Sequence, residues 1–165
     1  MVIGHKQQKE TLEQILNNYE NGGFLLCGPD GIGKFSLLKE ITEKKTTKDN
    51  LIIIEPLNGF ISKDTSELLR NFTLLSSRGL RIIVINEAHT LTDEAQNLLL
   101  KILEEIPSRT FFFFVASRPQ KILPTIRSRL QTLKFGPVGN EEIKNWLEAR
   151  ADKKELKTAC EMFPG

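Results

Sequence analysis

Short apolar runs recur along the chain and predict the strands of a sheet. Each run is only a few residues long and is bounded by polar or turn residues, which is typical of strands rather than of buried helices. The run from Leu51 to Ile54 contains no polar residue, which predicts a strand covered on both faces, as in a parallel sheet. The predicted strands span residues 24–27, 51–54, 81–85, 111–116 and 131–135.

Apolar residues spaced three and four positions apart predict the helices that connect these strands. In the first helix, Leu12, Ile15 and Leu16 lie on one face. A later helix begins near Thr92 or Asp93, either of which can cap its N-terminus. The predicted helices span residues 9–19, 36–44, 63–76 and 93–106, with a short helical segment within 119–129.

Strands that alternate with helices are typical of an α/β fold. For residues 1–137 we predict a five-stranded parallel sheet sandwiched by helices. The four phenylalanines at 111–114 fit a central buried strand better than an exposed platform for stacking on bases. From residue 138 the pattern is purely helical, with Ile143, Trp146 and Leu147 on one amphipathic face. Residues 138–165 are therefore predicted to begin a second, all-helical unit.

Composition and charge narrow the class of protein. A chain of 165 residues with a net charge of +2 suits one soluble domain with a small appendage, and this charge does not indicate a nucleic-acid partner. No apolar stretch approaches the ~20 residues of a membrane span, so we expect a cytoplasmic protein with no membrane partner. Cys27 lies in an apolar strand far from Cys160, and we expect it to be a buried, reduced thiol.

The segment from Gly28 to Phe35 follows the first predicted strand and precedes a helix. Its sequence, Gly-Pro-Asp-Gly-Ile-Gly-Lys-Phe, has the glycine and lysine spacing of a phosphate-binding P-loop. Glycines let successive backbone N–H groups face a phosphate, the helix N-terminus adds positive potential, and Lys34 reaches the outer phosphates. The position between a strand and a helix favours a nucleotide site over a simple glycine turn.

Two positions depart from the pattern that binds Mg²⁺. The P-loop pattern ends in Ser or Thr, whose hydroxyl ligates the metal, but this chain has Phe35. The strand 81–85 should end in an acid, but it ends in Asn86, whose carboxamide is a poorer ligand. Ser36 is rotated by about 100° around the helix relative to position 35. We therefore predict no metal ligands and weak or no Mg²⁺ binding, and Glu87 is either a vestigial general base or a carboxylate at a helix start.

Two strings in the second half of the chain resemble the bacterial clamp-loader small subunits of the AAA+ superfamily. One runs Asn-Glu-Ala-His-Thr-Leu-Thr at 86–92 and continues Ala-Gln-Asn-Leu-Leu-Leu-Lys-Ile-Leu-Glu-Glu-Ile-Pro at 95–107. The other is Ala-Ser-Arg-Pro at 116–119, followed by Ile-Leu-Pro-Thr-Ile-Arg-Ser-Arg-Leu-Gln at 122–131. The resemblance covers nearly the whole chain and implies an AAA+ P-loop NTPase fold and a role in DNA replication.

The resemblance assigns roles to individual residues. Ser117 is at the sensor-1 position, which faces the γ-phosphate region. Arg129 matches the arginine finger of a Ser-Arg-Cys motif, although Leu130 replaces the cysteine; such a finger enters the nucleotide site of a neighbouring subunit. Arg127 fits this role less well. The residues expected to contact a weakly bound ATP or ADP are Ile3, Gly28, Asp30, Gly31, Ile32, Gly33, Lys34, Phe35 and Ser36.

Within this family the chain most resembles the delta-prime type of DNA polymerase III, whose own ATP site is commonly degraded while its finger is retained. The combination of Phe35, Asn86 and Arg129 reproduces that asymmetry. The implied partners are gamma/tau-type and delta-type loader subunits, with the sliding clamp and primer–template DNA contacted indirectly. Lys101 gives weak support for direct DNA contact. The four-cysteine zinc module of many relatives has no counterpart after the P-loop helix, so we expect no zinc.

Other functions remain as alternatives. The main one is a catalytically active gamma-type ATPase, or a related AAA+ motor, that uses Ser36 and a water-bridged Asn86. The string at 86–89 also resembles the Asp-Glu-Ala-His helicases, but those need two nucleotide-fold domains. A small phosphotransferase would leave residues 125–131 unexplained. Proteins of the family that the chain resembles continue into a small helical lid domain with a sensor-2 arginine and then into a helical collar. The resemblance therefore implies that residues 138–165 begin this lid and that the chain is a fragment of a longer protein.

Overall fold

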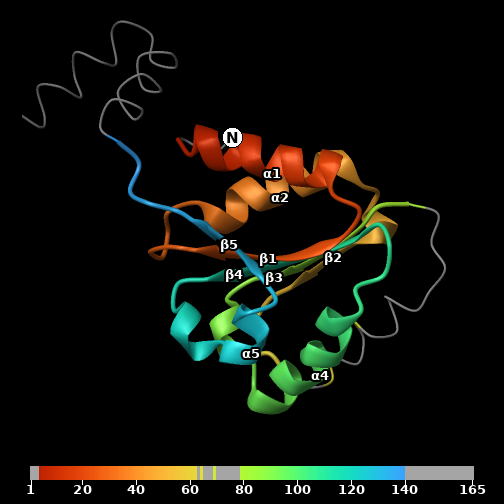
Figure 1. Ribbon diagram of the computed structural model, residues 1–165. Coiled ribbons are helices and arrows are strands. Elements are labelled where there is room, and N and C mark those ends of the chain that lie inside the picture. Colours follow the sequence, from red (N-terminus) through yellow and green to blue (C-terminus); the bar gives the residue numbers. More distant parts are fainter. Residues whose placement is uncertain (1–3, 63, 65–68, 70–78, 140–165) are drawn as a thin grey trace, which may run out of the picture.

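The computed structural model describes residues 4–62, 64, 69 and 79–139. Over these residues the chain forms a five-stranded parallel sheet with helices on both faces, which confirms the predicted α/β class (Figure 1). The strands are β1 (Gly22–Cys27), β2 (Leu51–Ile54), β3 (Arg81–Ile85), β4 (Thr110–Ala116) and β5 (Gln131–Lys134). The helices are α1 (Lys6–Asn18), α2 (Lys34–Lys45), α4 (Asp93–Glu104) and α5 (Pro124–Arg127), with 3-10 turns η1 (Lys48–Asn50), η2 (Ala88–Thr90) and η3 (Pro119–Lys121).

The strand order β2-β3-β4-β1-β5 explains which strands are fully buried. Strand β4 lies at the centre and every residue in it is buried, which confirms the prediction of a central strand at the phenylalanine run. Strand β2 lies at an edge, and Leu51, Ile52 and Ile53 are only partly buried. Leu51 and Ile53 nevertheless pack against the hydrophobic cluster on one face of the sheet, and Ile52 and Ile54 pack against the cluster on the other. Both faces of this strand are therefore covered as predicted, and its partial exposure comes from the open edge of the sheet.

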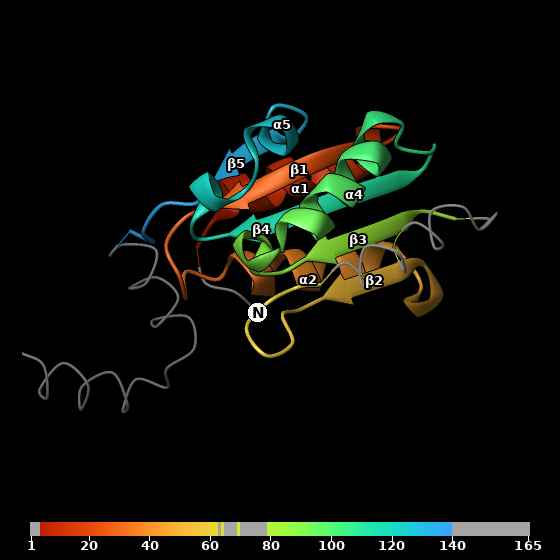
Figure 2. The same cartoon turned by 90° about the horizontal axis from the view of Figure 1, so that it is seen from below.

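Alternate residues of the inner strands belong to two separate hydrophobic clusters, one on each face of the sheet. On one face Phe111 and Phe113 pack with Leu12 of α1 and Leu37 of α2. On the other face the intervening residues of β4 pack with residues of α4 and α5, among them Leu99 and Ile126. Figure 2 shows α4 and α5 on the face turned toward the viewer, with α1 and α2 behind the sheet. The period of two along each strand thus accounts for both layers of helices.

Several local predictions can be compared with the structure. Thr92 is the N-cap of α4 and accepts a hydrogen bond from the backbone N–H of Ala95. Cys27 is partly rather than fully buried; burial raises the pKa of its thiol, and the nearby Lys134 and Lys34 partly oppose that rise. Within the described part of the chain, no helix is both long and apolar enough to cross a membrane. The predicted lid spans residues 138–165, and from residue 140 onward it lies outside the described residues. The predicted helix 63–76 also lies outside them, apart from residues 64 and 69.

Candidate nucleotide site

The carboxyl ends of the parallel strands meet at one edge of the sheet. Ile54 of β2 is paired with Ile85 of β3, which is paired with Phe114 of β4. Cys27 of β1 is paired with Ala116 of β4. The residues that follow these positions therefore emerge together, beside the turn from β1 into α2. This is the edge of an open α/β sheet at which ligands bind.

The turn from β1 to α2 needs glycine at two positions in particular. A Cβ atom at Gly28 would lie 2.4 Å from the carbonyl oxygen of Phe135, so no larger residue fits without displacing the backbone. Gly33 has φ of 95° and is the N-cap of α2, with its carbonyl accepting from the N–H of Leu37 at 2.9 Å. This left-handed conformation favours glycine. The glycine spacing in the sequence thus corresponds to a real backbone requirement.

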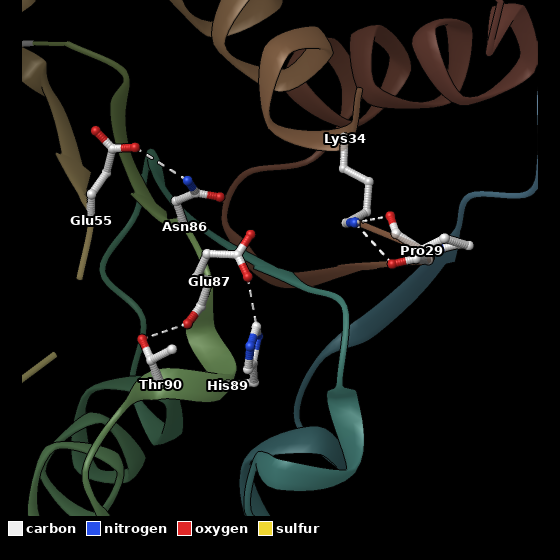
Figure 3. Close-up of polar contacts among 8 residues, drawn as sticks. Pro29, Lys34, Glu55, Asn86, Glu87, His89 and Thr90 are labelled. Carbon is white, nitrogen blue, oxygen red and sulfur yellow. Dashed lines mark hydrogen bonds and ion pairs between the residues drawn. The ribbon is translucent and has the colours of Figure 1, made fainter. Parts of the chain in front are cut away.

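The side chain of Lys34 is folded into the loop. It is 4% exposed, and its ammonium donates to the carbonyl oxygens of Gly28 at 2.8 Å and Pro29 at 2.6 Å (Figure 3). A buried ammonium needs such partners because it has lost its hydration. The loop therefore concentrates positive charge at the N-terminus of α2, where the helix dipole already favours an anion.

A cleft of about 140 Å³ lies beside this helix N-terminus. Its volume is below the roughly 300–1,000 Å³ of typical drug-sized ligand pockets, and it is large enough for the phosphate groups of a ligand. The lining residues are Gly31, Gly33, Lys34, Phe35, Ser36, Glu87 and Val115. Of the predicted nucleotide contacts, Gly28, Asp30 and Ile32 lie in the same turn without lining the cleft, and Ile3 is outside the described residues.

Phe35 and Ser36 are successive residues of the first turn of α2, and both line the cleft. The Phe35 ring is partly buried and also packs against the hydrophobic cluster beneath α1 and α2.

Asn86 directly follows β3, and its side chain forms a hydrogen bond on the side away from the P-loop. Its amide nitrogen donates to Oε1 of Glu55 at 3.2 Å, and Figure 3 shows the side chain between Glu55 and the loop. Its Oδ1 atom is buried and has no hydrogen-bond partner within the described part of the chain. One neutral oxygen here and a hydrocarbon ring at Phe35 make a donor set that does not fit Mg²⁺, which prefers carboxylate and phosphate oxygens. No group of three or more His, Cys, Asp or Glu residues that could hold a metal ion is found among the described residues.

Glu87 adopts a backbone conformation that is uncommon for a side chain of its type. Its φ is 50°, in the left-handed region, at the turn from β3 into η2. Its backbone carbonyl accepts from the hydroxyl of Thr90 at 2.8 Å, and its carboxylate lies 3.3 Å from Nδ1 of His89 without forming a hydrogen bond (Figure 3). Strained positions of this kind cluster at functional sites. The turn thus directs a carboxylate into the cleft beside Lys34.

Ser117 also carries a buried polar atom without a partner. Its hydroxyl oxygen is buried and lacks a hydrogen-bond partner in the described part of the chain, as does Oδ1 of Asn86. Ser117 follows Ala116, the β4 residue in register with Cys27, so it lies level with the start of the P-loop. Unsatisfied buried polar atoms are rare and mark places where a polar ligand or water belongs. The residues of this edge therefore fit a phosphate-bearing ligand.

Arg129 is located away from this cleft. It follows α5, and its guanidinium donates to Oε1 of Glu104 at 2.9 Å and to the carbonyl of Thr125 at 2.8 Å. The side chain is 36% exposed. Arg129 is not among the residues that line the cleft of its own chain. Arg127, the other predicted candidate, and Lys101 are exposed as well.

Two buried polar residues near the site were not identified from the sequence. The imidazole of His5 donates to the carbonyl of Ile32 at 2.8 Å and packs edge-on against Phe135, so it holds the P-loop from the outside. Gln96 of α4 is 2% exposed, and its Oε1 accepts from the backbone N–H of Leu123 at 2.7 Å. Gln96 lies within the string at 95–107 that carries the family resemblance, but no local pattern predicts these contacts, because each partner is 27 positions away in the sequence.

Comparison with known proteins identifies the family. The profile of the family described as "DNA polymerase III, delta subunit" matches residues 39–139, more than half of the chain. The chain belongs to this family. Its relatives place the family among the AAA+ clamp-loader proteins: Replication factor C subunit 3 of Blastobotrys adeninivorans is 24% identical over 98% of this chain and 50% of its own length. DNA polymerase III subunit gamma/tau of Mycobacterium bovis is 42% identical, over 44% of this chain and 13% of its own length.

Solved structures agree with the family assignment. A DNA polymerase III gamma subunit-related protein of Thermotoga maritima matches with a TM-score of 0.75 and 26% identity, covering 93% of this chain and 54% of that one. The RuvB Holliday junction branch migration motor of Thermotoga maritima matches with a TM-score of 0.63 and 20% identity, over 88% of this chain and 50% of that one, which shows a shared fold. The chain spans about half the length of the Replication factor C relative and of these two structures.

Proposed function

We propose that this chain is a delta-prime-like clamp-loader subunit that serves as a structural arm and donates Arg129 to the ATPase site of a neighbouring subunit. In this proposal its own P-loop binds ATP or ADP weakly, without Mg²⁺, and does not hydrolyse it. The partners are gamma/tau-type and delta-type subunits, and contact with the sliding clamp and primer–template DNA is indirect. The nucleotide-binding domain is assigned to residues 1–137 and the start of the lid to 138–165.

The donor set of the cleft carries this proposal. Hydrolysis of a nucleoside triphosphate in P-loop enzymes relies on Mg²⁺ held by a hydroxyl and an acid. Phe35 supplies a ring at the first position, and Asn86 supplies an amide that is already bonded to Glu55 at the second. Phosphate cradling by backbone N–H groups and Lys34 does not need these two ligands. The site therefore has the groups that bind phosphate but lacks the metal ligands that hydrolysis of a nucleoside triphosphate needs.

The location of Arg129 supports its assignment as a residue that acts on another molecule. It does not line its own cleft, yet its guanidinium is partly exposed at the surface beside α5. A guanidinium is always charged, and its planar fork can neutralise phosphoryl oxygens in trans. In other P-loop systems an arginine supplied by a partner raises hydrolysis by roughly 10³–10⁵-fold.

Reconstitution tests this function. The chain alone is expected to show no ATP turnover above that of a Lys34→Ala variant in the presence of Mg²⁺. In a complex with gamma/tau-type ATPase subunits, Arg129→Ala is expected to lower their hydrolysis by about tenfold or more. Arg127→Ala, at an exposed arginine of the same segment, is the matched control and should have little effect. Unchanged hydrolysis with Arg129→Ala would contradict the finger assignment.

A second candidate function, an active gamma-type ATPase, is favoured by one observation. Ser36 lines the cleft together with Glu87, so a hydroxyl and a carboxylate do reach the same space. Under this alternative the chain alone would hydrolyse Mg²⁺-ATP, and both Ser36→Ala and Lys34→Ala would abolish turnover. Under the proposed function Ser36→Ala changes nothing, because there is no turnover to lose.

A further inference from the structure

The guanidinium of Arg129 is held from two sides by its own chain. One terminal nitrogen donates to Oε1 of Glu104 at 2.9 Å, and the other donates to the carbonyl of Thr125 at 2.8 Å. Glu104 is the last residue of α4, and Thr125 is in α5. Two separate helices therefore determine where this side chain points.

These contacts leave much of the guanidinium unused. An arginine side chain carries five N–H donors, and the two hydrogen bonds engage one donor on each terminal nitrogen. Among the described residues the remaining three donors, including that of Nε, have no hydrogen-bond acceptor, so they can serve a phosphate from another molecule. The pair is also half exposed, with 36% of the Arg129 side chain and 54% of the Glu104 side chain accessible, so a partner can approach it.

Both supports are anchored in the core. Leu103, which precedes Glu104, is 6% exposed, and Ile126, which follows Thr125, is fully buried. A long side chain at a surface has many rotamers, and fixing it in one of them costs conformational entropy. A group that rigid neighbours already hold loses this entropy when the protein folds and not when the reaction occurs. This matters most for residues that act only in a transition state.

We propose that Glu104 is a positioning residue for Arg129: it orients the guanidinium before a neighbouring subunit's nucleotide arrives, and so raises the rate at which that neighbour hydrolyses ATP. The inference rests on the proposed function, in which Arg129 acts in trans. Glu104 lies at the C-terminal end of α4. The turn that holds Glu87 at the chain's own cleft comes just before the start of the same helix. In this proposal the acceptor oxygen of Glu104 fixes the direction of the guanidinium, within an ion pair of 2.9 Å.

Three variants of the chain, assembled with gamma/tau-type ATPase subunits, test this role. Glu104→Ala removes the acceptor and is expected to lower the kcat of the complex about 3- to 10-fold, with KM for ATP within about twofold. Glu104→Gln keeps an oxygen at the same place and should retain most of the activity. Glu105→Ala, which removes the adjacent exposed carboxylate, is the matched control and should behave as the parent chain.

A double variant establishes whether Glu104 acts through Arg129. If it does, Glu104→Ala should cause no further loss in an Arg129→Ala background. An additive loss would overturn the proposal, because Glu104 would then act independently. An unchanged or raised kcat with Glu104→Ala alone would also overturn it; a raised kcat would mean that the contact restrains Arg129 instead of orienting it.

A measurement on the chain without partners separates this proposal from the function on which it rests. The ¹⁵N relaxation of the Arg129 Nε–H bond, assigned by its loss in Arg129→Lys, reports the order of the side chain. Glu104→Ala should lower that order, whereas Glu104→Gln and Glu105→Ala should preserve it. Unchanged order in Glu104→Ala overturns the positioning role directly. Reduced order, combined with partner hydrolysis that is insensitive to Arg129→Ala, would instead overturn the trans function of the arginine.

Discussion

Replacing Gln96 with alanine should destabilise the domain, because the backbone groups that its side chain bonds, those of Leu91 and Leu123 above all, would lose this partner. Gln96 is buried on α4; its Oε1 accepts from the N–H of Leu123 at 2.7 Å and its Nε2 donates to the carbonyl of Leu91 at 3.2 Å. A buried group left without a partner costs about 1–3 kcal/mol. Two such groups, one of them only partly buried, give a total of about 2–4 kcal/mol. For a domain of this size that corresponds to a fall in Tm of about 4–16 °C.

Thermal unfolding followed by circular dichroism measures this effect, with Asn97→Ala as the control. Asn97 is the next residue of α4 and is exposed, so its truncation should change Tm by less than about 2 °C. Gln96→Glu adds a test of mechanism, because its carboxylate would face the Leu91 carbonyl. Burial raises the folded-state pKa of such a carboxyl, so its stability should improve as pH falls through that pKa. Equal Tm values for Gln96→Ala and Asn97→Ala would refute the hydrogen-bond account.

Three further predictions concern the sheet and the P-loop. Phe113→Ala should cost about 3–5 kcal/mol in urea unfolding, because the ring is fully buried in the central strand; a loss below 1 kcal/mol would contradict its core position. Gly28→Ala should abolish nucleotide binding in calorimetry, because the new Cβ would lie 2.4 Å from the Phe135 carbonyl, and undiminished binding would refute this constraint. In a Cys160→Ser background, Cys27 should react slowly with a disulfide reagent at pH 8, because burial raises the pKa of its thiol. The midpoint of the rate–pH profile should therefore lie above that of a free thiol, and a midpoint at or below the free-thiol value would contradict this prediction.

The strands could be predicted from the sequence because their apolar runs are dictated by burial. The run at 111–114 is buried on both sides of the sheet, and residues with no contact to water carry an unambiguous apolar pattern. The partial exposure of Leu51, Ile52 and Ile53 could not be predicted, because it depends on the position of β2 at the edge of the sheet. Strand order is a tertiary property that no local pattern encodes.

The site was predictable where a motif constrains the backbone and not where side chains meet across the fold. The P-loop was recognisable because glycine is required at Gly28 and Gly33 for steric reasons. The bond between Asn86 and Glu55 joins residues 31 positions apart, and that between Arg129 and Glu104 joins residues 25 apart. Such pairs depend on which elements become neighbours, so a single sequence does not reveal them.

The most direct test of the account is the effect of Mg²⁺ on ATP affinity, measured by titration calorimetry with either Mg²⁺ or EDTA in the buffer. The parent chain is expected to bind ATP with the same weak affinity in both, because Phe35 and Asn86 offer no adequate ligands. A Phe35→Thr, Asn86→Asp variant should bind more tightly with Mg²⁺ than with EDTA, provided its Tm shows that it is folded. Tighter binding of ATP by the parent chain in Mg²⁺ than in EDTA would contradict the claim that residues at these two positions no longer bind the metal ion.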